Sequence, residues 1–260
     1  MPATEQACVR LETDSEIATL ILDTGPDNPW HESALLELNE QVTALAREAR
    51  YRCVIISANG DVGSADRNWF SRGLQEGALD RDDPLLGANL ARLFTQAFGA
   101  LRRFPGVTLA AVNGHARDEG LALALNCDFR IASEGATFQF RAGSQGRVPF
   151  GGSTQLLPRL VGESWAKRLL LMEPTVDAAQ ALAIGLVDEV VAADQVMSTA
   201  RARAEQCLRQ TPMAARAGKQ LIEHARMRPL ETGFAAEREW QASLFEAGEH
   251  RIPGRPADSQ

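Results

Sequence analysis

The chain has few lysines and no long apolar run, and each shortage excludes a class of protein. Lys167 and Lys219 are the two lysines among 260 residues, and the formal net charge is -7. Without a basic excess there are few counterions to release from phosphates, so the composition excludes a general nucleic-acid or anionic-membrane binder. No apolar segment approaches the roughly 20 residues of a membrane span, and MPATEQACVRLETDSE has no signal or transit pattern, so we expect a cytoplasmic protein.

Cysteine and histidine are also scarce and widely spaced. The four cysteines are Cys8, Cys53, Cys127 and Cys207. They form no CxxC pair, and no two histidines stand at HxxxH spacing. The sequence therefore predicts neither a disulfide framework nor a metal site.

Hydrophobic patterns predict an α/β body followed by helices. Short apolar or alternating runs predict strands at 9–13, 18–23, 53–56, 109–112 and 129–132, the first two as a hairpin. Helical spacing predicts helices at 33–45 and 85–104. Beyond about residue 162, the segments 163–172, 177–184, 194–210, 212–225 and 230–248 predict an all-helical tail.

One stretch, residues 108–138, combines a buried strand with a helix start. Asn113-Gly114 ends the strand, and Asp118, Glu119 and Gly120 supply acidic and small residues where a helix should begin. A helix N-terminus at the end of a buried strand can stabilise an anion.

The order of motifs resembles the crotonase family, the enoyl-CoA hydratase/isomerase superfamily. WFSRGLQ is similar to the family's F-x-A-G-x-D motif, and AAVNGHARDEGLALALNCDFRIAS to its glycine-rich segment. VPFGGSTQLLPRLVG and VDAAQALAIGLVDEVV resemble two later motifs. The resemblance implies a spiral of ββα units with a C-terminal helical region. It assigns residues 1–190 to an acyl-CoA-binding core and residues 191–260 to a helical trimerisation region that is shorter than usual.

The resemblance also implies a ligand and an assembly. The ligand is an acyl-CoA thioester, with CoA as part of the substrate and no separate cofactor. The backbone N–H groups of Leu74 and Glu119 would form an oxyanion hole for an enolate-like anion. The assembly is a homotrimer or a dimer of trimers, with no nucleic-acid or membrane partner.

Two departures from the family pattern restrict the chemistry. The two glutamates with which the hydratases add water correspond by motif to Ala122 and Ala142. Alanine cannot transfer a proton, so ordinary hydration should be absent or very slow. Isomerase, hydrolase, carbon–carbon lyase or decarboxylase chemistry is favoured instead, and the alternative is a non-catalytic acyl-CoA-binding or assembly subunit.

Charged residues near the glycine-rich segment have two interpretations each. Glu119 is either a base facing the substrate or a carboxylate that only favours the helix dipole, whereas Asp118 should point to solvent. His115 is either an acid or base, or a loop histidine hydrogen-bonded to the backbone. The candidate catalytic residues are therefore Leu74, Glu119 and His115.

The candidate substrate-binding residues surround these positions. They are Trp69, Phe70, Arg72, Gly73, Arg117, Gly120, Ala122, Arg141, Ala142 and Val148. Arg72, Arg117 and Arg141 can bind a carboxylate or a CoA phosphate, or pair with nearby acids. Trp69 and Phe70 can line an acyl pocket or belong to the core. For Arg130 and Arg159 we expect structural ion pairs with Asp118, Glu119 or Glu134.

Overall fold

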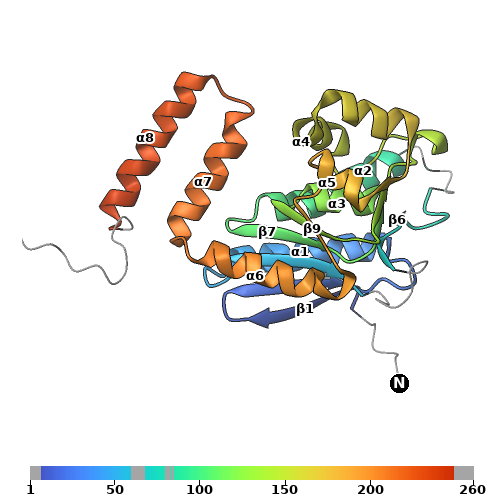
Figure 1. Cartoon of the computed structure of the whole chain (residues 1–260), viewed down its shortest axis with the longest axis horizontal. Helices are drawn as coiled ribbons and strands as arrows, with labels where there is room; N and C mark the ends of the chain where they lie inside the picture. Colours follow the sequence, from blue (N-terminus) through green and yellow to red (C-terminus); the bar gives the residue numbers. More distant parts are fainter. Residues whose placement is uncertain (1–6, 60–67, 80–82, 84, 249–260) are drawn as a thin grey trace, which may run out of the picture. The chain divides into compact units, whose positions relative to one another are not determined.

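The computed structural model describes residues 7–59, 68–79, 83 and 85–248. The chain divides into two compact units, Met1–Ala204 and Glu205–Gln260. Strands and helices alternate along the first unit, so the predicted α/β class is confirmed (Figure 1). Among the described residues, no helix combines the length and apolar character needed to cross a membrane.

A six-stranded sheet in the order β1-β2-β4-β7-β9-β12 forms the centre of the first unit. Its members are β1 (Val9–Asp14), β2 (Ile17–Leu22), β4 (Cys53–Ala58), β7 (Val107–Val112), β9 (Phe129–Ser133) and β12 (Glu189–Val191). β1 and β2 pair antiparallel, which confirms the predicted hairpin, and the other neighbours pair in parallel. Every residue of β4 is buried, as expected for a parallel strand covered on both faces.

Shorter strands build two smaller sheets that the sequence did not predict. The order β11-β10-β8-β5 joins β11 (Val176–Asp177), β10 (Thr137–Gln139), β8 (His115–Arg117) and β5 (Trp69–Ser71). A separate pair joins β3 (Pro29–Trp30) to β6 (Gly73–Leu74). Strands of two or three residues are too short to show a hydrophobic period, so only their partners define them.

The prediction of an all-helical tail after about residue 162 is wrong, because β11 and β12 pair with strands of the body. The helix predicted at 163–172 begins earlier, as α4 (Ser153–Lys167), and continues as a π-helical turn at Arg168–Met172. Gly162 interrupts it with a φ of 78°. The next predicted helix is confirmed as α5 (Ala178–Ala183), which Asp177 caps through the Gln180 N–H.

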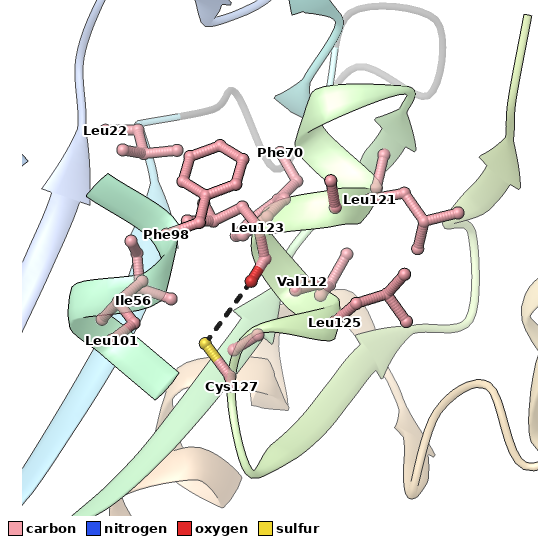
Figure 2. Packing of buried hydrophobic residues seen from close by; sticks show 14 of the residues in the cluster. Leu22, Ile56, Phe70, Phe98, Leu101, Val112, Leu121, Leu123, Leu125 and Cys127 are labelled. Carbon is pink, nitrogen blue, oxygen red and sulfur yellow. Dashed lines mark hydrogen bonds between the residues drawn. The ribbon is translucent and has the colours of Figure 1, made fainter. Parts of the chain in front are cut away.

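Two long helices and α3 (Glu119–Leu125) enclose the core of this unit. α1 (Glu32–Arg47) and α2 (Leu86–Arg102) confirm the predicted helices and pack against each other. Figure 2 shows Leu123 of α3 beside Phe98 of α2, and both side chains are fully buried, as is that of Leu121. Burying each such side chain stabilises the fold by about 1.5–3 kcal/mol. The core therefore fixes where α3 begins.

The second unit is helical. It contains α7 (Pro212–Ala225), α8 (Leu230–Glu246) and the end of α6 (Val196–Leu208). Thr211 caps α7 through the Ala214 N–H, and Pro212 occupies its first turn. α7 and α8 pack against each other, which agrees with the helices predicted at 212–225 and 230–248. The division of the chain at residue 190 into a binding core and a trimerisation region stays a prediction.

Candidate active site

The site is built where β7 ends and α3 begins. The Asn113 side chain donates to the Ala58 carbonyl at 2.8 Å, which ties the turn after β7 to the end of β4. A Cβ at Gly114 would lie 1.9 Å from the Asn68 carbonyl oxygen, so the chain passes too close for any other residue. This packing fixes the path through β8 into the first turn of α3.

Asp118 is buried, so the prediction that it points to solvent is wrong. It has a φ of 44° and is 2% exposed. Its Oδ1 accepts the Arg141 N–H at 2.7 Å, and its Oδ2 lies 3.7 Å from Arg147 Nη2. Burial raises the pKa of the Asp118 carboxyl to about 6, with a smaller contribution from neighbouring Glu119. The tertiary fold therefore makes Asp118 a group that titrates close to neutral pH.

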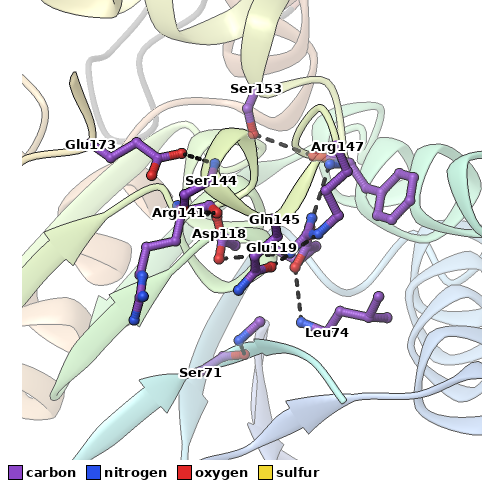
Figure 3. A network of polar contacts seen from close by, with 12 residues as sticks. Ser71, Leu74, Asp118, Glu119, Arg141, Ser144, Gln145, Arg147, Ser153 and Glu173 are labelled. Carbon is purple, nitrogen blue, oxygen red and sulfur yellow. Dashed lines mark hydrogen bonds and ion pairs between the residues drawn. The ribbon is translucent and has the colours of Figure 1, made fainter. Parts of the chain in front are cut away.

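Glu119 is fully buried and connects strand β6 to the loop before α4 (Figure 3). Its Oε2 accepts the Leu74 N–H at 2.8 Å, and its Oε1 pairs with Arg147 Nη1 at 2.5 Å. The Phe150 N–H lies 3.5 Å from the same Oε1. The Leu74 N–H, one of the two backbone groups expected to form an oxyanion hole, therefore already donates its hydrogen bond to a carboxylate oxygen.

Arg147 lies at the candidate site, although the sequence did not single it out. It lies in the glycine-rich loop before α4, and its side chain is 12% exposed. The clue in the sequence was an arginine in a loop that the resemblance places at the active site, together with two adjacent acids, Asp118 and Glu119. Buried carboxylates are usually paired with a cation, and arginine is the side chain best suited to pair with two of them.

A pocket of about 540 Å³ opens beside this network. Its lining includes Leu74, Asp118 and four arginines, which are Arg72, Arg117, Arg141 and Arg147. Arg72 pairs with Asp27 at 3.5 Å, and Arg117 lies 4.7 Å from the centre of the Trp69 ring. Burial, together with the charges of Arg141 and Arg72, lowers the pKa of Arg117 from its usual value. The pocket is therefore suited to an anionic ligand.

A second pocket, of about 420 Å³, shares Leu79 and Arg147 with the first. Val148, Phe150 and several glycines and small residues line it. Val148 is 64% exposed, and Phe150 stacks on Phe94 with 5.3 Å between ring centres. An apolar space thus adjoins the cationic one, with Arg147 at their junction.

The predicted aromatic and histidine residues line neither pocket. Phe70 is fully buried in the core. Trp69 packs edge-on against His115, with 5.3 Å between ring centres. His115 Nδ1 lies 2.8 Å from the Thr137 hydroxyl oxygen. Arg130 forms the expected structural ion pair, although with Asp188 at 3.0 Å.

The two alanines and two glycines of the predicted site contribute close packing. Ala122 and Ala142 are both 0% exposed and line neither pocket. A Cβ at Gly120 would lie 2.4 Å from the Ser71 carbonyl oxygen, so α3 approaches β5 too closely for a side chain. Gly73 has a φ of 100°, and a Cβ there would lie 2.9 Å from Glu119 Oε2. These contacts hold the Leu74 N–H against the start of α3.

Over residues 7–59, 68–79, 83 and 85–248, no three His, Cys, Asp or Glu side chains gather in an arrangement that could hold a metal ion.

Comparison with known proteins agrees with this architecture. Residues 12–255 match the family model described as enoyl-CoA hydratase/isomerase. The chain is 29% identical to the short-chain-enoyl-CoA hydratase of Clostridium acetobutylicum, over 91% of this chain and 89% of that protein. It is 31% identical to the 2,3-dehydroadipyl-CoA hydratase of Escherichia coli, over 87% and 85% respectively. The structure of DspI from Pseudomonas aeruginosa is similar, with a TM-score of 0.88, 35% identity, and coverage of 94% of this chain and 92% of that one. The chain therefore has the crotonase fold and belongs to the enoyl-CoA hydratase/isomerase family of acyl-CoA-processing enzymes.

Proposed function

We propose that this enzyme acts on an acyl-CoA thioester by stabilising an enolate, and that it does not add water by the two-glutamate mechanism. The observation that carries the proposal is the pair of fully buried alanines, Ala122 and Ala142, at the positions that the family resemblance assigns to the hydratase glutamates. Neither side chain can donate or accept a proton. Isomerisation, hydrolysis, carbon–carbon cleavage and decarboxylation remain the candidate reactions.

The backbone N–H groups of Leu74 and Glu119 form the proposed oxyanion hole. The Leu74 N–H already holds an anionic oxygen at 2.8 Å, which supports a role in binding the thioester oxygen as negative charge develops. The Glu119 N–H belongs to the first turn of α3, where backbone donors have no partner within the helix.

Cleavage reactions suit this site best, because they require few proton transfers. Decarboxylation of a 2-carboxyacyl thioester breaks one carbon–carbon bond, releases carbon dioxide and leaves the electron pair on the enolate. One proton must then reach the α-carbon. Asp118, with its pKa raised to about 6, and Glu119 are the candidate acids and bases beside the pocket.

Glu119→Gln tests whether the Glu119 carboxylate is the catalytic base. We expect the substitution to lower turnover at least about a hundredfold, the usual contribution of a positioned base. Release of the CoA thiol and deuterium incorporation at the α-carbon in heavy water are followed over a panel of acyl-CoAs. Kinetics like those of the unchanged enzyme would exclude the base role.

A non-catalytic acyl-CoA-binding subunit is the second candidate. The observation that favours it is that the Glu119 carboxylate accepts the hydrogen bond of the Leu74 N–H, one of the two proposed oxyanion donors. Absence of both thiol release and deuterium incorporation, together with saturable binding, would favour this candidate. Absence of saturable heat in calorimetry over the same panel would remove the acyl-CoA assignment altogether.

The proposed assembly, compartment and cofactor requirement are taken from the family resemblance. We propose a cytoplasmic homotrimer or dimer of trimers that needs no cofactor beyond the CoA of its substrate. In the helical unit, the apolar side chains of Ile222, Leu230 and Phe234 are at least 43% exposed, which supports burial in an assembly. Sedimentation equilibrium of the full chain would measure the number of subunits.

A further inference from the structure

Arg147 is the residue on which both pockets and both buried acids converge. It lines the cationic pocket and the apolar pocket. Its two terminal nitrogens face different carboxylates, Nη1 at 2.5 Å from Glu119 and Nη2 at 3.7 Å from Asp118. A guanidinium can hold a carboxylate through parallel hydrogen bonds, so its pairing with Glu119 can be exchanged for pairing with a ligand.

The Glu119 carboxylate occupies the position that a thioester oxygen needs. One backbone N–H makes one well-aligned hydrogen bond, and the Leu74 N–H makes its bond to Glu119 Oε2. A thioester that binds through Leu74 must therefore move Glu119 aside. That movement separates Glu119 from Arg147 and leaves the guanidinium with Asp118 alone, at 3.7 Å, which weakens the charge pairing of a largely buried cation.

The distances from Glu119 to its two donors also indicate what kind of anion could replace it. A single carboxylate reaches both donors, with one oxygen 2.8 Å from the Leu74 nitrogen and the other 2.5 Å from Arg147 Nη1. The two donors are thus close enough for oxygens that share one carbon. A ligand that binds both donors must therefore carry a thioester oxygen and an anionic oxygen that are separated by very few bonds.

We propose that the substrate is a 2-carboxyacyl-CoA of the malonyl type, whose own carboxylate replaces Glu119 on Arg147 while its thioester oxygen takes the Leu74 N–H. Arg147 is then a specificity-determining residue, because it offers a partner only to an acyl group that brings a carboxylate. An uncharged acyl group has to displace Glu119 without compensating Arg147. The inference rests on the proposed function, since it places the thioester oxygen at Leu74.

A pair of nearly isosteric ligands tests this inference. Malonyl-CoA and acetoacetyl-CoA differ by a carboxylate in place of a methyl ketone, and succinyl-CoA places the carboxylate one carbon farther away. All three carry the same CoA, so differences in affinity report the acyl group and not the phosphates. Dissociation constants are measured by calorimetry with product analysis, and a ligand that is converted is compared by kcat/KM.

We expect the unchanged enzyme to bind malonyl-CoA about tenfold or more tightly than acetoacetyl-CoA or succinyl-CoA. Arg147→Met should abolish this preference, whereas Arg159→Met, at an exposed arginine of α4 that lines neither pocket, should keep it. Glu119→Ala should raise the affinity for acetoacetyl-CoA several-fold, because nothing then competes for the Leu74 N–H. A gain in affinity cannot result from misfolding.

The outcomes separate the inference from the proposed function. Equal binding of the three ligands, tighter binding of succinyl-CoA, or a malonyl preference that survives Arg147→Met would overturn the inference and leave the thioester assignment intact. Unchanged acetoacetyl-CoA affinity in Glu119→Ala would do the same. If none of the three ligands binds the unchanged enzyme while another acyl-CoA of the panel does, the inference fails and the proposed function stands; if no acyl-CoA of the panel binds, both fail.

Discussion

Replacing Arg147 with methionine removes the cation from two buried carboxylates and keeps a long apolar stem in its place. Glu119 is 0% exposed and Asp118 is 2% exposed, so water cannot take over the lost ion pair in the native packing. Breaking a buried pair by removing one partner costs about 3–5 kcal/mol. Arg147 is 12% exposed, so we expect the lower end, about 3 kcal/mol of unfolding free energy near neutral pH.

The loss should depend on pH with a definite sign. The charge of Arg147 lowers the pKa of Asp118, so without Arg147 the folded-state pKa of the Asp118 carboxyl rises further, whereas its unfolded-state pKa stays near 4. The folded state then binds more protons than the unfolded state above about pH 4, so stability falls as pH rises through that window. The variant should therefore lose about 3 kcal/mol at about pH 8 and clearly less at about pH 5.

Urea unfolding at both pH values and at one protein concentration measures these differences. Arg159→Met is the control, because an exposed arginine should change stability by no more than about 0.5 kcal/mol. Glu119→Gln combined with Arg147→Met removes both charges and should recover part of the loss. A loss below about 1 kcal/mol, or an equal loss at both pH values, would refute the view that Arg147 neutralises buried charge.

Two further substitutions address the same strand–helix junction. In the unchanged protein, a carboxyl whose pKa is raised from 3.8 to about 6 should lower the stability by about 2 kcal/mol between pH 4 and pH 6, and Asp118→Asn should remove this pH dependence. Parallel urea titrations of both proteins measure it, and identical profiles would contradict the assignment. Gly120→Ala places a Cβ 2.4 Å from the Ser71 carbonyl oxygen and should cost about 1–3 kcal/mol and reduce turnover, whereas Gly218→Ala, with nothing within 4 Å, should cost nothing in thermal unfolding.

Local patterns were sufficient for five of the six strands of the main sheet, all but β12, and for the helices α1, α2, α7 and α8. The alternation at 9–13 and 18–23 gave the hairpin, and the apolar run at 109–112 gave β7. The spacing of Leu35, Leu38 and Val42 gave α1. In each case the apolar pattern covers enough residues to show whether its period is that of a strand or of a helix, because one face of the element must be buried. Two-residue strands such as β11 carry no such period.

The residue types at the site also followed from the sequence, but their pairing did not. Alanines at 122 and 142, and acids at 118 and 119, are visible in the printed chain. Arg147 is 28 residues from Glu119 along the chain, and their contact depends on how the glycine-rich loop folds back over α3. Sequence spacing within a loop does not fix which distant side chain it reaches.

The sequence by itself determined the α/β class, the strand-to-helix junction and the alanines at 122 and 142, because these depend on short-range periodicity and on residue identity. Only the tertiary structure decided that Asp118 and Glu119 are buried, that Arg147 neutralises them, and that a carboxylate occupies the Leu74 N–H. The physical reason is that burial and charge pairing depend on distances between segments far apart in the chain. Local propensity carries no information about those distances.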